Sequence, residues 1–403
     1  MRVFATLCCL LCTLSLARLA KADGLDGVQP LRSISDYTIT RYVPRVGEQR
    51  FLPQAERVEH LAHAKVALAD YGAIRRDFFA GRQITNAEID RWLLAQVAFV
   101  SSAQTQQTIF NESISTRGGA REAHRPRAYG RGLVFEVFDP ADSQHKLGLI
   151  DSKGNGFAKM PKRKNNHCSH CNGLMTLGEA LREFSYERMV NKVQKHAASG
   201  RTTVNSYAVI SAGFSIKQGD GSRAPAALYL RQAHRRGLAN SGDLGRQRAL
   251  LEHYGINAGF AVQGTPEGHL VDFGDYLGMP AKSAYALPLK LWGAPGKQDP
   301  QADNPWRWGH ETAEAFAAGR AKRHHVWLFH RKLLDSMEAR LARTSQTRFE
   351  WAKSKADPIR AWIQQLSTSR PLAAKRRAAP PAWQSLRMRG RRPGTSPRLG
   401  GQR

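Results

Sequence analysis

A lysine, a glutamate and an aspartate stand in three segments of this sequence whose patterns suit phosphate chemistry. Lys153 ends an apolar, strand-like run, and the permissive backbone of Gly154 and Gly156 beside it lets a polyphosphate approach closely. Glu183 lies in a helical segment, from which a carboxylate can orient a strand lysine. Asp272 leaves an apolar run before an aromatic residue and a glycine, which suits a carboxylate directed at Mg²⁺.

Each of these features also has an ordinary structural interpretation. A lysine on a hairpin is commonly a surface residue, helices are rich in glutamate, and a three-residue match around Asp272 arises by chance. The occurrence of all three in this order, on a strand, a helix and a strand end, is far more specific than any one alone. The sequence therefore predicts a phosphate-handling site built from distant segments.

Four segments together resemble the nucleotide-binding core of the selenoprotein O family, and the resemblance extends over roughly residues 130–278. They are Ile150 to Gly156, Leu181 to Phe184, Leu230 to Ala233 and Val271 to Gly274. Members of that family have a protein-kinase-like fold and transfer AMP from ATP to protein hydroxyl groups. The resemblance thus implies ATP as substrate, Mg²⁺ or Mn²⁺ as cofactor, and a protein as acceptor.

The resemblance assigns roles residue by residue. Lys153 matches the phosphate-contacting lysine, Glu183 its helix partner, and Asp272 the metal-binding aspartate. Arg231 matches an arginine that holds the outer phosphate of ATP. Such a site works mainly by alignment and by neutralising developing charge, so it needs little covalent chemistry from the protein.

The sequence departs from the family pattern at several positions. Val262 and Gln263 occupy the places of an Asp-Asn pair whose Asn binds metal, and Gln263 keeps a carbonyl oxygen as a candidate ligand. A second phosphate-binding arginine is missing, although Arg235 and Arg236 lie close to its place. Residues 129–132 are the candidate for the glycine-rich cover loop. These departures leave an inactive relative open, as well as a kinase-fold enzyme with another reaction.

The elements that must position these residues follow from periodicity. A helical pattern extends from Pro53 to Gln107, with a capping box at Thr85 to Glu88. After it, we expect strands at 133–138 and 147–152, a helix at 177–197, strands at 206–216 and 226–232, a helix at 244–254, two short strands within 260–274, and helices at 312–342 and 347–366. This order indicates an α+β fold. With the resemblance, we expect a protein-kinase-like two-lobed fold: a small antiparallel sheet with a helix, then a mainly helical C-terminal part.

The chain divides into five regions by composition and pattern. We expect a signal peptide at 1–22, a mainly helical region at 23–125, a strand-rich nucleotide-binding lobe at 126–236, a mainly helical lobe with the Asp-Phe-Gly motif at 237–367, and a disordered basic tail at 368–403.

The N-terminus has the pattern of an export signal. Arg2 is followed by an apolar stretch from Val3 to Ala17, and Ala20-Lys21-Ala22 fits a small-x-small cleavage site. A buried N-terminal helix is the alternative. We expect an exported protein, periplasmic or secreted, without a transmembrane anchor after cleavage, because no later apolar run approaches the roughly 20 residues that span a bilayer.

Signal cleavage would leave two cysteines, Cys168 and Cys171, flanked by His167 and His170. An oxidising compartment permits a disulfide between them. Plain thiols and a zinc site remain open, although ligands in so short a stretch rarely complete a tetrahedron alone.

The chain is strongly basic: 61 Lys and Arg against 33 Asp and Glu give a net charge of +28 over 403 residues. Residues Arg370 to Arg403 contain ten Lys or Arg and no acidic residue. Such a charge favours anionic partners. The alternative to a transferase is therefore a non-catalytic basic secreted protein, or an ATP-binding pseudoenzyme, that binds an anionic polymer or a membrane surface through this tail.

Overall fold

The computed structural model describes residues 28, 30–43, 47–105, 113–126, 131–157, 172–217, 222–237, 241–257, 262–274, 276–278 and 305–342. The expected signal peptide, the cysteine pair at Cys168 and Cys171, the helix expected at 347–366 and the basic tail lie outside these residues. Residues 129 and 130 of the expected cover loop, 129–132, do so too.

A large antiparallel sheet carries the fold. Its strands are β3 (Gln54–His60), β4 (Lys65–Ala69), β5 (Phe99–Ser101), β6 (Arg121–Arg125), β7 (Gly132–Phe138), β8 (Lys146–Lys153), β9 (Met175–Thr176), β10 (Ser206–Lys217) and β11 (Arg223–Gln232). Among the described residues these nine strands pair in the order β4-β10-β11-β8-β7-β6-β3-β5, and β9 pairs with β11. β8 is thus a central strand, and its last residue, Lys153, lies opposite Gly132 on one side and Tyr229 on the other.

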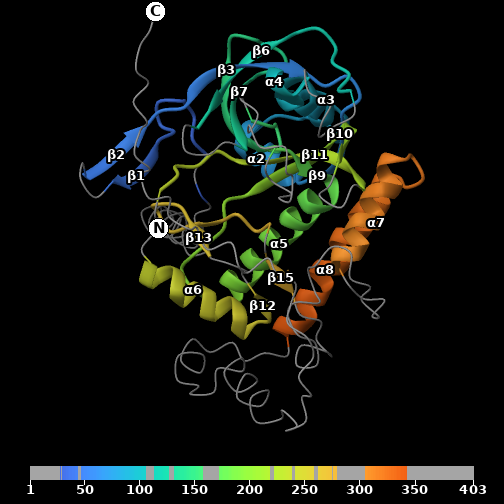
Figure 1. Cartoon of the computed structure of the whole chain (residues 1–403). Coiled ribbons are helices and arrows are strands. Elements are labelled where there is room, and N and C mark those ends of the chain that lie inside the picture. The colour runs from blue at the N-terminus through green and yellow to red at the C-terminus, as the bar shows by residue number, and fades with distance from the viewer. Residues whose placement is uncertain are drawn as a thin grey trace, which may run out of the picture. The chain divides into compact units, whose positions relative to one another are not determined.

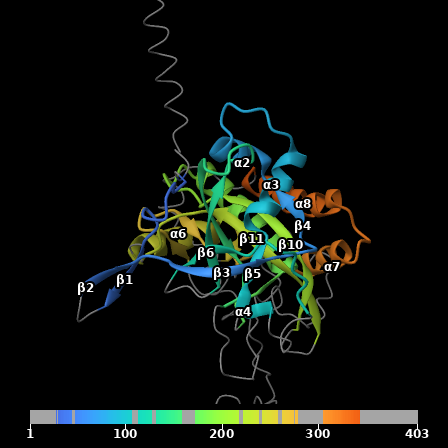
Figure 2. The same ribbon diagram turned by 90° about the horizontal axis from the view of Figure 1, so that it is seen from above.

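Three pairs of short strands lie outside this sheet. They are β1 (Ile39–Val43) with β2 (Gly47–Phe51), β12 (Ile256–Asn257) with β15 (Leu277–Gly278), and β13 (Gln263–Gly264) with β14 (Leu270–Val271). The hairpin of β1 and β2 projects away from the main sheet (Figure 2). The pair β13–β14 confirms the two short strands expected before the Asp-Phe-Gly motif.

The helices are α2 (Tyr71–Phe78), α3 (Asn86–Val97), α4 (Ser102–Thr105), α5 (Leu177–His196), α6 (Ser241–His253), α7 (Pro305–Ala317) and α8 (Arg323–Leu341). The expected capping box is present, since Thr85 and Glu88 exchange hydrogen bonds between side chain and backbone at the start of α3. Thr176 caps α5 in a similar way, because its hydroxyl accepts a hydrogen bond from the backbone N–H of Glu179.

The two faces of the sheet belong to different apolar cores. Successive side chains of a strand point to opposite faces, so Leu228 and Leu230 of β11 join a core with α2 and α3, whereas Tyr229 joins the core that contains α5. Figure 1 shows α5 (green) below β9 and β11, and α3 above β10. α7 and α8 pack beside α5 and extend its core. Two described layers of helix therefore cover the sheet, which agrees with the α+β class expected from the sequence.

Three expectations from the sequence are wrong. The helical pattern from Pro53 is two strands, β3 and β4, at 54–69, so the N-terminal region is not mainly helical. The sheet is correspondingly larger than the small one expected. The single helix expected at 312–342 is two helices, because Gly319 adopts a left-handed φ of 74° after α7 and ends it. None of the helices in the described ranges combines the length and apolar character needed to cross a membrane.

Candidate functional site

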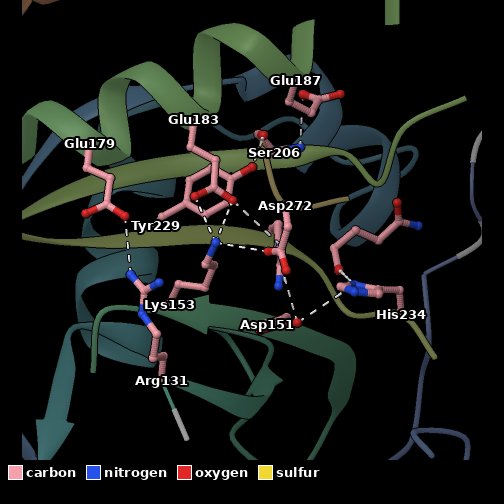
Figure 3. Close-up of polar contacts among 12 residues, drawn as sticks. Arg131, Asp151, Lys153, Glu179, Glu183, Glu187, Ser206, Tyr229, His234 and Asp272 are labelled. Atoms are coloured by element: carbon pink, nitrogen blue, oxygen red, sulfur yellow. Dashed lines mark hydrogen bonds and ion pairs between the residues drawn. The ribbon is translucent and has the colours of Figure 1, made fainter. Parts of the chain in front are cut away.

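Lys153 meets Glu183 in the interior of the protein. The Lys153 Nζ donates to both carboxylate oxygens of Glu183, at 2.8 and 2.9 Å, from the end of β8 to the middle of α5 (Figure 3). The side chain of Lys153 is 4% exposed and that of Glu183 is fully buried. Tyr229, the cross-strand neighbour of Lys153, places its ring centroid 5.9 Å from the ammonium, so the cation also lies near an aromatic ring.

Asp272 completes this group from the other side. It follows β14, which is held by a hydrogen bond from Val204 to the carbonyl of Leu270. Its carboxylate accepts from Lys153 Nζ at 3.0 Å and from Arg231 Nη1 at 2.8 Å. Lys153, Glu183 and Asp272 are called the front cluster below. The four residues matched from the sequence, these three and Arg231, therefore lie together although they come from four distant segments.

The backbone of Asp272 is strained. Its φ is 60°, in the left-handed region that residues other than glycine adopt infrequently. Its side chain is 14% exposed, so it is the most accessible part of the front cluster. Strained backbone of this kind persists where the surrounding structure enforces it, and it is common at binding and catalytic sites.

The charges of the front cluster are strongly coupled. Burial alone would raise the pKa of the Asp272 carboxyl, but the adjacent Lys153 and Arg231 cations outweigh it and hold the pKa well below its usual range. Burial, together with Glu183 and Glu187, raises the pKa of the Tyr229 hydroxyl well above its usual value. The aspartate is therefore ionised and the tyrosine neutral throughout the physiological pH range.

Arg231 joins the front cluster to a second buried group. Its Nε lies 3.5 Å from the carboxylate of Asp151, a fully buried residue of β8 that also pairs with Arg236. His234 lies 3.8 Å from the same carboxylate. Asp151, His234 and Arg236 are called the rear cluster below. One arginine thus lies between a carboxylate on each side, Asp272 and Asp151.

Burial also shapes the pKa values of the rear cluster. Burial opposes ionisation of Asp151, but Arg236 and Arg231 overcome it and lower the pKa of the carboxyl. Burial and the Arg231 and Arg236 cations lower the pKa of His234 to about 3. His234 is consequently neutral at physiological pH, and the charge balance here is that of one carboxylate against two guanidinium groups.

Further contacts fix the segments that surround the front cluster. Arg131, before β7, donates to Glu179 at 3.3 Å, one helical turn before Glu183 (Figure 3). Arg182 donates to the carbonyl oxygen of Gly274. A Cβ added at Gly274 would lie 3.2 Å from the Glu183 carboxylate, which is tighter than most real contacts. The glycine of the Asp-Phe-Gly motif therefore lets the chain pass close to α5.

The two glycines after Lys153 have a packing role. A Cβ at Gly154 would lie 2.3 Å from the carbonyl oxygen of Ala227, and one at Gly156 would lie 2.2 Å from the side chain of Gln104. Their backbone N–H groups donate to the carbonyls of Arg131 and Gly173. Glycine is therefore required at both positions because other parts of the protein lie close to the backbone there. The expected approach of a phosphate to Gly154 and Gly156 is not what these contacts indicate.

Three other predicted site residues lie elsewhere or at the margin. Arg235 is half-exposed and pairs with Glu267, away from Asp272, whereas Arg236 belongs to the rear cluster. Gln263 is exposed and is the cross-strand partner of Val271, the residue before Asp272. The structure therefore brings the backbone of Gln263 beside that of Val271 and pairs Arg235 with Glu267 rather than with Asp272.

Residues missed from the sequence include Asp151, Tyr229 and Glu179, and Arg131 was expected only as part of the cover loop. Asp151 had a usable signal, because a charged residue inside an apolar strand run must be paired when it is buried. Tyr229 stands two residues before Arg231, so strand alternation puts both on one face of β11. For Glu179 and Arg131 we find no local signal, since their contact depends on how β7 and α5 pack.

Asp272 offers oxygen ligands for a divalent cation. Within the described part of the chain, no group of three or more His, Cys, Asp or Glu side chains could hold a metal by itself. Mg²⁺, however, is commonly bound by one or two protein oxygens, with water and phosphate oxygens completing its shell. The carboxylate of Asp272 fits a cation that binds together with a phosphate, and the backbone of Gln263 pairs with that of Val271, the residue before Asp272.

The chain matches no protein-family model and no curated protein. The function is therefore best judged from the geometry of the two clusters.

Proposed function

We propose that this protein is an ATP-dependent transferase with a kinase-like arrangement of its site, and that it transfers AMP to hydroxyl groups of an acceptor protein in an exported compartment. The observation that carries the proposal is the lysine of a central strand held between a helix glutamate and an aspartate after a short strand. In protein kinases a strand lysine paired with a helix glutamate, and an aspartate that holds Mg²⁺, form the phosphate-transfer site.

The two cations beside Asp272 are suited to a polyphosphate. Lys153 and Arg231 both donate to the Asp272 carboxylate. A phosphate group that bound at this position would exchange those contacts for its own oxygens, and Asp272 would turn to a divalent cation with Gln263. The cation, when bound, would neutralise charge on the phosphate oxygens.

The proposed step is an in-line displacement at phosphorus. The acceptor hydroxyl oxygen forms a bond to the α-phosphorus, the bond from that phosphorus to the oxygen bridging to the β-phosphorus breaks, and pyrophosphate leaves. The hydroxyl proton is released to water. Lys153 and Arg231 would stabilise the charge that develops on the departing pyrophosphate, and Glu183 would keep Lys153 in place.

Isotope position distinguishes the two possible transfers. Incubation of the full chain with Mg²⁺ or Mn²⁺ and candidate proteins should give labelled acceptor from ATP labelled at the α-phosphate and none from ATP labelled at the γ-phosphate. Lys153→Met should abolish the labelling. Lys146→Met is the matched control, because Lys146 begins the same strand and pairs with Glu136 at the surface.

Three results would contradict the proposal. Label from the γ-phosphate alone would indicate phosphoryl transfer, and ATP binding without any labelled product would indicate a pseudoenzyme. Absence of nucleotide binding would remove the proposal altogether. Deletion of 370–403 separates it from the alternative, because a binder of anionic polymer should lose its binding whereas a transferase should keep its nucleotide site.

A further inference from the structure

Helix α8 has two different faces. Its apolar face packs into the core beside α5 and α7, and the buried residues follow helical spacing: Val326, Phe329, His330, Leu333 and Met337. Arg323 at its first turn pairs with Asp90 of α3 and lies over the ring of Tyr71. These contacts hold α8 at its start and along one side, and its other side faces outward (Figure 1).

The outer face carries an exposed apolar pair. Trp327 and Leu328 are 51% and 52% exposed, and they are two of the three large hydrophobic side chains that the described residues expose. The exposed residues on this side are His324, Trp327, Leu328, Arg331, Lys332 and Asp335, at spacings that put them on one stripe of the helix. The pair lies in the middle of the stripe.

The surroundings of the pair are basic. Arg331 and Lys332 follow it by one turn, and exposed Arg320 and Lys322 precede α8. The acidic residues on this side are Asp335, which pairs with Arg331, and Glu338, which is 44% exposed and pairs with Lys192. With two acidic groups against five cations, the stripe, the turn before it and Lys192 have a positive excess, which complements a negatively charged surface.

The size of the apolar pair restricts what can cover it. A tryptophan and a leucine at half exposure leave on the order of 200 Å² of apolar surface, far below the roughly 800 Å² per partner of a stable protein interface. An apolar pair that projects from a helix among cations instead has the pattern of interfacial anchors, in which Trp and Leu enter the headgroup region and Lys and Arg contact anionic lipids.

We propose that this stripe of α8, residues 324–335 with Arg320 and Lys322, docks the protein on an anionic lipid bilayer. The proposal is independent of the transferase function, because neither the front nor the rear cluster contributes a residue to it. It also differs from binding through the basic tail, since it predicts insertion of a particular tryptophan.

The first test measures binding of the full chain to vesicles of phosphatidylcholine with 30% phosphatidylglycerol. The double variant Trp327→Ala/Leu328→Ala should bind about tenfold more weakly, because buried apolar area and electrostatic attraction act together. Leu52→Ala is the matched control, since Leu52 is a 59% exposed leucine outside α8. Equal affinity of the double variant and the wild type would overturn the proposal.

The second test detects insertion directly. Vesicles with brominated acyl chains should quench part of the tryptophan fluorescence of the wild type, and Trp327→Phe should lose that quenching while it keeps most of its binding. The basic tail is present in both proteins and does not explain such a difference. Unchanged quenching in Trp327→Phe would refute docking by this face. So would a lower melting temperature of the double variant with unchanged vesicle binding, which would show that another part of the chain covers the pair.

Discussion

Arg231 lies between the front and rear clusters, which differ in the exposure of their carboxylates and in backbone conformation. In the rear cluster the side chain of Asp151 is fully buried and that of His234 is 3% exposed, so no ligand reaches them without rearrangement. In the front cluster Asp272 is partly exposed and has a left-handed φ. The left-handed backbone thus occurs on one side of the arginine only, and on the other side the carboxylate and the imidazole are buried while Arg236 is 11% exposed.

This difference indicates that the front cluster is the functional site and that the rear cluster supports it structurally. Buried ion pairs are weak evidence for stability by themselves, but the loss of one partner leaves an uncompensated buried charge. Asp151 of the rear cluster pairs with one side of the Arg231 guanidinium, and Asp272 of the front cluster pairs with the other side. We infer that changes in the front cluster mainly affect activity and changes in the rear cluster mainly affect folding.

The largest effect is expected for Asp272→Asn. This change keeps the shape of the side chain but removes the charge that would hold the cation, so AMP transfer should fall about 10³-fold, equivalent to about 4 kcal/mol in the barrier. Initial rates with α-labelled ATP measure it, and a parallel thermal unfolding curve separates the loss of rate from a loss of folded protein, because the carboxylate also pairs with Lys153 and Arg231. A variant with wild-type rates would mean that Asp272 is structural.

The rear cluster should respond in the opposite sense. Asp151→Asn leaves Arg231 and Arg236 without their buried counter-ion, and the free energy of unfolding should fall by about 3 kcal/mol or more. Denaturant titration measures this fall. Glu338→Gln, which breaks a surface pair with Lys192, is the control and should leave stability nearly unchanged. A loss for Asp151→Asn no greater than that of the control would remove the distinction between the clusters.

Acid should destabilise the rear cluster through His234. Its pKa is about 3 in the folded protein and is expected near 6.5 when unfolded, so the unfolded chain takes up the proton first as the pH falls. The stability that this histidine contributes is present above pH 6.5 and is lost toward pH 3, by about 2 kcal/mol between pH 7 and 5.

His330, whose pKa burial lowers to about 4, should add a similar dependence. Burial also lowers the pKa of His60, His124 and His269, so His234→Asn should reduce the slope of stability against pH in this range without removing it, as followed by melting temperature. His145→Asn, on the exposed turn between β7 and β8, is the control. An unchanged slope in His234→Asn would show that the folded protein accommodates the charged ring.

The smallest effect concerns backbone strain in the front cluster. Asp272→Gly and Asp272→Ala both remove the carboxylate, but only glycine adopts a φ of 60° without cost. The glycine variant should be more stable than the alanine variant by about 1 kcal/mol, although both should be inactive. Paired unfolding curves test this difference, and equal stabilities would mean that the left-handed backbone is relaxed by local movement.

Much of the fold around the site could be predicted from local patterns. The strands at β7, β8, β10 and β11 and the helix α5 were all expected, because alternation and helical periodicity are clear there. The region of β3 and β4 was mistaken for helix, since Val58, Leu61, Val66 and Leu68 have spacings that suit either period. Pairing of these strands with β6 and β10, which are distant in the chain, decides between the two.

The chain of amino acids alone determined which side chains could handle phosphate: a strand lysine, a helix glutamate, an arginine and an aspartate in the expected order. Only tertiary packing decided that Asp151 pairs with Arg231 and that Arg235 pairs with Glu267 instead of Asp272. Packing also decided that protein atoms fill the space beside Gly154 and Gly156. The physical reason is the distance along the chain over which each effect acts. Periodicity and residue type act over a few neighbouring residues, whereas the burial and pairing of a charge depend on segments more than a hundred residues apart, as Lys153 and Asp272 are.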